Sequence, residues 1–234
     1  MSQDLAYEEY ISINYIKNML KKSGYVHVST NSTLEDFYEL ANILGEIINK
    51  SDINILLSSD RLYKQPQKID FHTDGPDADI VGWFCVKQDA YQGHSALLDS
   101  RQILKHFSCE ELTLLGTIMV TYPIGNSVNK EVPLIQKTIA GHYALCYLPW
   151  SDPDFNLSPS QKAIYSAFKY AVSEEASKQL IRIRLHKNEM LLIDNKRILH
   201  GRAKIEKNSL RMLKRVWINC GNYETETNLD ILSL

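Results

Sequence analysis

Residues 191–202 read Leu-Leu-Ile-Asp-Asn-Lys-Arg-Ile-Leu-His-Gly-Arg, and they join an apolar strand to a histidine. The strand is predicted to run into a turn at Asp194 and Asn195, after which a short apolar pair leads to His200. Gly201 permits a close backbone approach or unusual dihedral angles beside that histidine. A lone histidine in an apolar stretch is usually a core residue satisfied by hydrogen bonds. The stretch alone therefore predicts a β-rich fold and does not by itself indicate a metal site.

Short β-runs of the same kind occupy most of the chain after its first third. The predicted runs cover residues 80–87, 95–99, 116–123, 142–148, 181–185, 190–193 and 211–219. One clear helix interrupts them, because Ser158 and Gln161 form a capping box with Pro159 at the first helical position, and it is expected to reach about Gln179. A weaker helical pattern covers residues 104–115. This order of elements predicts a mainly β fold with flanking helices, built as a double-sheet barrel or jelly roll.

The first third of the chain reads as helix, strand, helix. Apolar residues at helical spacing predict a helix from Tyr10 to Lys22, which the following Ser-Gly pair ends. Residues 25–29 are a short strand candidate. Thr33 is expected to cap a second helix that continues to about Asn49.

No internal repeat, low-complexity tract or Gly/Ser linker marks a domain boundary in the 234 residues. We therefore expect one domain over residues 1–234, with a helical support at about residues 1–50. The scattered cysteines form no Cys-x-x-Cys pair, which argues against a zinc ribbon or a thioredoxin-type site. They are expected to be reduced thiols packed as small hydrophobic groups: Cys85, Cys109, Cys146 and Cys220.

The charge balance gives no sign of a polyanionic partner. Lys and Arg total 26 against 28 Asp and Glu, for a formal charge of -2. Such a balance lacks the electrostatic footprint of a protein that binds nucleic acid or an anionic membrane. No apolar run is long enough to span a bilayer, and the acidic N-terminal residues do not form a signal peptide. We expect a cytoplasmic protein with a small-molecule partner.

A second motif, residues 71–76, reads Phe-His-Thr-Asp-Gly-Pro. In an extended chain, side chains two positions apart lie on the same face, so His72 and Asp74 can bind one metal ion. The Gly-Pro pair then ends the strand and turns the chain. Taken alone, His-x-Asp is a common combination, and a polar strand end explains it equally well.

A third motif, residues 211–218, reads Arg-Met-Leu-Lys-Arg-Val-Trp-Ile. In a strand, Arg211, Arg215 and Trp217 share one face. Two arginines among bulky apolar groups are costly to bury unless they meet a fixed anion, and a guanidinium suits a carboxylate bound by two hydrogen bonds. Alternatively, the arginines lie on the solvent face of an edge strand and the intervening apolar residues form the core. The period of two cannot choose between these interpretations.

The combination of the three motifs is more specific than any one of them. Two imidazoles and one carboxylate on one face of Fe(II) leave three positions open for a 2-oxo acid and O₂. The far carboxylate of that acid then needs a cation, which an arginine on the strand after the second histidine can supply.

These residues resemble a known family. The triplet His72-Thr73-Asp74, the distant His200 and Arg211 eleven positions beyond it are similar to the taurine dioxygenase and clavaminate synthase-like branch of the Fe(II)/2-oxoglutarate oxygenases. Residues 194–202 match the Asp-Asn-x-Arg-x-x-His-Gly-Arg segment of that branch. The resemblance covers roughly Phe71 to Trp217 and implies a double-stranded β-helix, the cupin-like form of the jelly roll.

The resemblance also implies roles for individual residues. His72, Asp74 and His200 match the iron ligands and so the catalytic centre. Arg211 matches the arginine that binds the distal carboxylate of 2-oxoglutarate. Arg215 matches a position that supports the co-substrate or contacts the substrate.

A further candidate lies in residues 91–95, which resemble the Gly-Gly-x-Thr/Ser turn whose hydroxyl assists 2-oxoglutarate. Ser95 takes the place of that hydroxyl, although Gln92 replaces the first glycine. Tyr63 and Trp150 are candidate walls of the site.

The expected reaction is hydroxylation of a C–H bond with release of succinate and CO₂, using Fe(II), 2-oxoglutarate and O₂. Desaturation and cyclisation stay open as outcomes of the same chemistry. The substrate is expected to be small and polar, amino acid-like or carrier-bound. Two alternatives remain: a cupin-like metalloenzyme that does not use 2-oxoglutarate, and a non-catalytic β-sandwich binding module.

Overall fold

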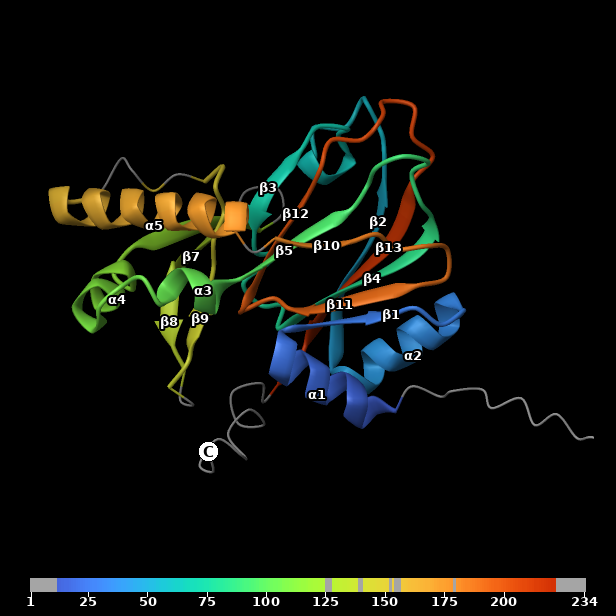
Figure 1. The fold of residues 1–234 in the computed structure, drawn as a ribbon, viewed down its shortest axis with the longest axis horizontal. Helices are drawn as coiled ribbons and strands as arrows, with labels where there is room; N and C mark the ends of the chain where they lie inside the picture. Colours follow the sequence, from blue (N-terminus) through green and yellow to red (C-terminus); the bar gives the residue numbers. More distant parts are fainter. Residues whose placement is uncertain are drawn as a thin grey trace, which may run out of the picture.

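The computed structural model describes residues 12–124, 128–138, 141–151, 153, 157–178 and 180–221 (Figure 1). Two antiparallel sheets form its centre. The larger has the strand order β1 (Tyr25–Val28), β11 (Met190–Asp194), β4 (Ile80–Lys87), β13 (Met212–Asn219) and β2 (Glu46–Asn54). The smaller has the order β10 (Ile181–Ile183), β5 (Ser95–Asp99), β12 (Ile198–Arg202) and β3 (Ile69–His72). This pair of sheets agrees with the expected jelly-roll architecture.

The larger sheet is buried on both of its faces, as β4 shows. Its Val81 and Trp83 pack toward the smaller sheet, in a cluster with Leu97. Ile80 and Phe84 pack on the opposite face, in the cluster that includes the two N-terminal helices. Successive residues of a strand point to opposite faces, so a strand apolar at every position is buried on both sides.

The helices α1 (Ile13–Ser23) and α2 (Leu34–Leu44) cover the outer face of the larger sheet (Figure 1). The expected Thr33 cap is present, with Asp36 completing the capping box. The expectation that α2 continues to Asn49 is wrong, because the helix ends before Gly45 and the chain enters β2. The start predicted at Tyr10 lies outside the described residues.

A lobe of helices and hairpins flanks the barrel (Figure 1). Its members are α3 (Ser100–Leu104), α4 (Cys109–Leu115), β6 (Met119–Ile124), β7 (Val128–Pro133), β8 (Ile135–Lys137), β9 (Tyr143–Leu145) and α5 (Pro159–Lys178). The capping box of Ser158 and Gln161 is confirmed. The single helix expected over residues 104–115 is instead two helices, because Ser108 caps a new one. The strands expected over 116–123 and 142–148 are β6 and the shorter β9.

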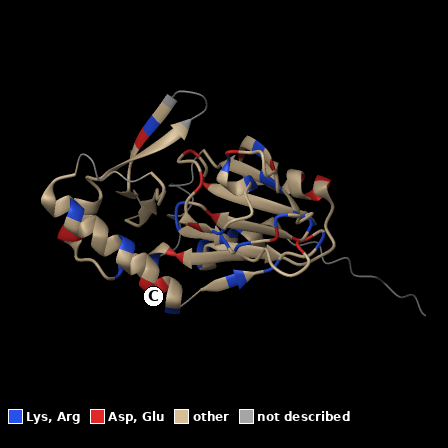
Figure 2. Cartoon of the chain, turned by 90° about the horizontal axis from the view of Figure 1, so that it is seen from above, with Lys and Arg blue, Asp and Glu red and all other residues tan. Residues whose placement is uncertain are grey.

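None of the helices in the described ranges is long and apolar enough to cross a membrane. The four cysteines are free thiols; Cys85 and Cys146 are buried, as expected, whereas the expectation of packing is wrong for Cys109, which is exposed. Figure 2 shows both signs of charge interspersed along the described ribbon, including the β6–β7 hairpin that projects from the lobe. A single domain over all of residues 1–234 stays a prediction.

Candidate metal centre

Neighbouring strands of the smaller sheet bring His200 together with His72 and Asp74, which are far from it in the sequence. His72 ends β3, and His200 of β12 is its register partner on the neighbouring antiparallel strand. A Cβ on Gly201 would lie 2.7 Å from the carbonyl oxygen of Ile69, so only glycine allows this close pairing. The potential ligand atoms of His72, Asp74 and His200 all lie within 4.8 Å of one another.

The imidazoles present the same nitrogen toward the carboxylate. Nε2 of His72 lies 3.7 Å, and Nε2 of His200 3.8 Å, from Oδ1 of Asp74. The carbonyl oxygen of Asp70 lies 2.8 Å from Nδ1 of His72, a contact that places the proton on Nδ1 and leaves Nε2 as the free donor of a lone pair. Burial, reinforced by His72, lowers the pKa of His200 to about 3. His200 is therefore neutral at physiological pH, the form of histidine that binds metals.

The Asp74 carboxylate is held by two donors from β13. Nε1 of Trp217 donates to Oδ2 at 2.8 Å, and Nη1 of Arg215 donates to Oδ1 at 3.2 Å and to Oδ2 at 3.0 Å. Burial alone would raise the pKa of this carboxyl. The Arg215 guanidinium and the two imidazoles overcome that effect and hold the pKa of Asp74 well below its usual range. Asp74 is thus an anion ready to bind a cation.

Two further residues fix the turn that carries Asp74. The buried Asn195 side chain accepts from the backbone N–H of Asp74 at 2.8 Å and donates to the carbonyl of Ala78 at 2.9 Å. Thr73 exchanges hydrogen bonds with the backbone of Tyr147 through its N–H and its hydroxyl, both at 2.9 Å. The sequence predicts only that Asn195 belongs to a turn. Its neighbours in the sequence do not indicate a contact with residues 74–78, so this supporting role was not predicted.

The two arginines that flank His200 in the sequence have structural partners. Arg197 makes a bidentate ion pair with Asp99 and donates to carbonyls at the end of α1. Arg202 donates to the carbonyls of residues 63, 65 and 67, and so attaches that loop to β12. These contacts explain the motif around His200 without a ligand.

Arg215 lies on the inner face of β13, and Arg211 directly precedes that strand; both line a cavity between the two sheets. β13 pairs with β4 on one side and β2 on the other, so it is not an edge strand. Arg211 is 4% exposed, and its Nε donates to Oε1 of Gln88 at 3.1 Å. Its terminal amino groups have no hydrogen-bond partner among the residues that the structure describes. Burial, with Arg202 nearby, lowers the pKa of Arg211 to about 10, so it remains a cation at neutral pH.

One cavity connects Arg211 to the histidines. Its lining includes His72, His200, Ser95, Arg211 and Arg215. The predicted Ser95 thus lies in the same cavity as the predicted 2-oxoglutarate arginine.

The turn before Ser95 packs directly on Arg211. Gly93 has a φ of +89°, and a Cβ there would lie 2.5 Å from Oε1 of Gln88 and 3.2 Å from Nε of Arg211. Glycine is required for both the left-handed backbone and the close approach. This turn therefore fixes the position of the Gln88–Arg211 hydrogen bond.

The expected wall residues border the site. The ring of Trp150 lies 4.8 Å from that of His72, and Arg215 lies over the ring of Tyr63 at 4.9 Å. The nearby acids have other contacts: Asp77 binds Lys130, and Asp79 accepts from the backbone N–H of Cys220. They are loop charges in this structure.

A family model, "Taurine catabolism dioxygenase TauD, TfdA family", matches residues 4–217, which is most of the chain. The chain belongs to the TauD/TfdA family. No curated protein sequence matches it. Membership of this family agrees with the predicted enzyme class, a 2-oxoglutarate-dependent dioxygenase, and not with the two alternatives.

Solved structures share the fold of this TauD/TfdA family member at low sequence identity. An asparagine oxygenase in complex with Fe(II), 2S,3S-3-hydroxyasparagine and succinate has a TM-score of 0.71 and 13% identity, covering 89% of this chain and 79% of that one. The non-haem iron oxygenase OrfP in complex with Fe, succinate and (3S)-hydroxy-L-Arg has a TM-score of 0.69 and 14% identity, with 89% and 80% covered. PvcB from Pseudomonas aeruginosa has a TM-score of 0.65 and 16% identity, with 89% and 80% covered. These similarities confirm the predicted jelly-roll fold.

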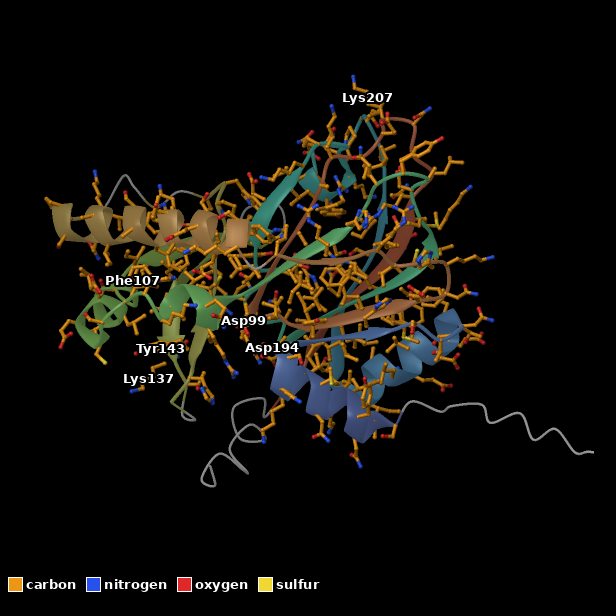
Figure 3. The ribbon with its side chains drawn as sticks, viewed as in Figure 1. Asp99, Phe107, Lys137, Tyr143, Asp194 and Lys207 are labelled. Carbon is orange, nitrogen blue, oxygen red and sulfur yellow. The ribbon has the colours of Figure 1, made fainter. Side chains whose placement is uncertain are left out.

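A larger cavity of this TauD/TfdA family member lies elsewhere. It has a volume of about 680 Å³, and its lining includes neither the two histidines nor Asp74. Phe107 and Tyr143 of the lobe and Asp194 of the barrel border it (Figure 3). Size alone would point to this groove, whereas the chemistry points to the smaller cavity between the sheets.

Proposed function

We propose that this chain is an Fe(II)- and 2-oxoglutarate-dependent oxygenase that hydroxylates a C–H bond of a small polar substrate. One observation carries the proposal: the buried guanidinium of Arg211, whose terminal amino groups have no hydrogen-bond partner among the described residues, shares a cavity with two imidazoles that adjoin a buried carboxylate. Metal ligands alone would fit many enzymes. The additional cation specifies a second, anionic component beside the metal.

In this proposal His72, Asp74 and His200 bind the iron. Two imidazoles and a carboxylate are the donor set of non-haem Fe(II) oxygenases, and they leave open positions for other ligands. When bound, Fe(II) with 2-oxoglutarate supplies the oxidising power for insertion of oxygen from O₂, with release of succinate and CO₂. The protein contributes binding, orientation and exclusion of water.

Arg211 is proposed to bind the distal carboxylate of 2-oxoglutarate through its terminal amino groups. A planar guanidinium matches a carboxylate with two parallel hydrogen bonds, and burial strengthens the interaction. The hydroxyl of Ser95 is proposed to donate to the same co-substrate from the opposite sheet.

The substrate is proposed to be an amino acid or a derivative of one. The asparagine oxygenase and OrfP structures contain hydroxylated amino acids, which supports this class of substrate. Tyr63 and Trp150, with the guanidinium of Arg215, border the metal centre and offer aromatic walls beside one cation. More specifically, we propose that the amino acid could be bound to a carrier. The near-neutral charge of the chain supports an enzyme without a nucleic-acid or anionic-membrane partner, which we propose to be cytoplasmic.

Anaerobic titration tests the cofactor assignment. The wild-type protein with Fe(II) and 2-oxoglutarate is expected to develop a weak visible charge-transfer band that His72→Ala abolishes. Arg211→Gln should require much more 2-oxoglutarate to reach the same band. A folded wild-type protein that gives no band contradicts the proposal.

A substrate screen tests the reaction. Free amino acids and simple derivatives are added with Fe(II), 2-oxoglutarate and O₂, and succinate is measured. A substrate of the proposed class should stimulate succinate formation and gain the mass of one oxygen atom. Stimulation without this gain would indicate desaturation or cyclisation and would contradict hydroxylation.

A further inference from the structure

The two oxygens of the Asp74 carboxylate have different surroundings. Both of the short distances to imidazole nitrogens involve Oδ1, at 3.7 Å and 3.8 Å. Oδ2 instead accepts the indole N–H of Trp217 at 2.8 Å. One oxygen therefore adjoins the histidines while the other is occupied by the protein.

Trp217 distinguishes the two oxygens, and Arg215 does not. Nη1 of Arg215 lies almost equally far from both, at 3.2 Å and 3.0 Å, so it compensates the charge without selecting an orientation. The indole is a single neutral donor that bonds only to Oδ2. It fixes the rotation of the carboxylate and leaves the negative charge available to a metal.

The surrounding backbone is adapted to this contact. A Cβ on Gly75, the residue after Asp74, would lie 2.6 Å from Cζ3 of Trp217, so the indole packs directly on the glycine. The register between β13 and β2 shifts between Trp217 and Ile218. A shift of this kind redirects side chains locally.

We infer that Trp217 is a positioning residue that holds Oδ2 of Asp74 so that the carboxylate binds the metal through Oδ1 alone. The inference rests on the proposed metal triad and adds to it. A carboxylate that bound through both oxygens would take a second metal position, one that a two-atom co-substrate and O₂ require. Trp217 thereby preserves the open positions that the proposed reaction needs.

Cobalt(II) binding, measured by calorimetry without O₂ or substrate, tests this role. Trp217→Phe keeps an aromatic ring and removes the N–H. It should bind Co(II) about tenfold or more weakly than wild type, since loss of a hydrogen bond to a ligand typically costs roughly 10–100-fold in metal affinity. Trp83→Phe is the matched control, because the Trp83 ring lies 5.0 Å from His200 but its N–H is not bonded to Asp74. Trp83→Phe should bind Co(II) with an affinity within about threefold of wild type, which is a smaller loss than the roughly 10–100-fold expected when a hydrogen bond to a ligand is removed.

Trp217→Gln separates hydrogen bonding from packing. Glutamine is smaller than phenylalanine but restores an N–H donor, so it should recover part of the Co(II) affinity that Trp217→Phe loses. If packing alone matters, Trp217→Gln should be the weaker binder of the two. Equal affinities for Trp217→Phe and Trp83→Phe would overturn the inference.

Two additional variants complete the experiment. Gly75→Ala does not change residue 217, but the added methyl group displaces the indole ring of Trp217. This variant should weaken Co(II) binding, and it can be tested even if the Trp217 variants do not fold. Unchanged affinity in a folded Gly75→Ala protein would count against Trp217. His72→Ala tests the triad itself: if it binds Co(II) like wild type, the proposed metal site fails, independently of the role of Trp217.

Discussion

Arg211, directly before β13, and Arg215, on β13, lie four residues apart and line the same cavity, but their contacts differ. Arg215 has an anionic partner within the chain: it pairs with Asp74, donates to Ser51 and lies over the ring of Tyr63. Arg211 is at least as buried, yet among the described residues the only hydrogen-bond partner of its guanidinium is Gln88, which accepts from Nε. Burial of a guanidinium is costly without an anion. In one case the anion is part of the chain, and in the other we propose that it is the co-substrate.

The contrast gives a general criterion for such sites. Removing one partner of a buried ion pair leaves an uncompensated charge and destabilises the protein, whereas a buried cation without an internal anion is a candidate ligand site. The same substitution at the two positions should therefore have opposite effects on the protein without ligand. The variants below test this from the largest expected effect to the smallest.

Asp74→Ala removes a metal ligand and the partner of Arg215 together. We expect Fe(II) binding and succinate formation to fall to background, because a two-histidine site cannot replace the charged ligand. Asp77→Ala is the matched control on the same turn, since Asp77 pairs with Lys130 at the surface. Comparable losses in the two variants would show that the turn, rather than the ligand, is responsible.

Arg215→Met should destabilise the protein without ligand by about 3–5 kcal/mol, because it leaves a buried carboxylate uncompensated. Urea unfolding of the metal-free protein measures this effect. The double variant Arg215→Met/Asp74→Leu should regain much of the loss, since both charges are then absent. An unchanged midpoint for the single variant would contradict the importance of the pair.

Arg211→Met is the same substitution at the other position. It should leave the free energy of unfolding unchanged or raise it by up to about 2 kcal/mol, since a poorly compensated charge is removed. The affinity for 2-oxoglutarate should fall about 100-fold, on the order of 3 kcal/mol, with Fe(II) affinity preserved. Destabilisation as large as that of Arg215→Met would remove the distinction between the two arginines.

Gly93→Ala probes the turn that supports Arg211. The left-handed backbone and the close approach to Gln88 should cost about 1–3 kcal/mol in stability and weaken 2-oxoglutarate binding. Gly141→Ala is the control, because it also has a positive φ but no atom of the described residues beyond its chain neighbours lies within 4 Å of the position that its methyl group would take. Equal 2-oxoglutarate affinities in the two variants would argue against a role for the turn.

Ser95→Ala should have the smallest effect. Loss of one hydroxyl hydrogen bond should weaken 2-oxoglutarate binding by about 0.5–1.5 kcal/mol, with no change in Fe(II) affinity. Ser95→Thr should retain most of the binding. A wild-type affinity in Ser95→Ala would exclude the hydroxyl as a contact of the co-substrate.

Local patterns predict much of the fold. The strands at Ile80–Lys87 and Ser95–Asp99 and the capping box at Ser158 are confirmed, because each depends on neighbours in the sequence. The helix predicted to reach Asn49 is wrong over the start of β2, since the isoleucines there continue the helical spacing of α2. The strand conformation of β2 depends on pairing with β13, which is distant in the sequence.

In the site too, features that depend on local sequence motifs could be predicted, whereas contacts between distant residues could not. The motif spacing indicates His72, Asp74 and His200 as candidates, and the structure brings their ligand atoms within 4.8 Å of one another. The orientation of β13 could not be predicted, because both of its faces are buried and each carries apolar residues. The sequence does not identify Trp217 as a donor to Asp74, since an indole among apolar neighbours gives no local sign of a polar contact.

Arg202 gives the loop at residues 63–67 an unusual thermodynamic character. Its guanidinium is bonded to three alternate carbonyls of that loop and is anchored two residues after His200. Releasing the loop would leave the buried Arg202 guanidinium and three carbonyl oxygens without their hydrogen bonds at the same time. Partial opening of the loop is therefore not favourable in free energy. The wall that contains Tyr63 should therefore exchange its amide hydrogens together with those of β12, as one cooperative unit rather than as an ordinary surface segment.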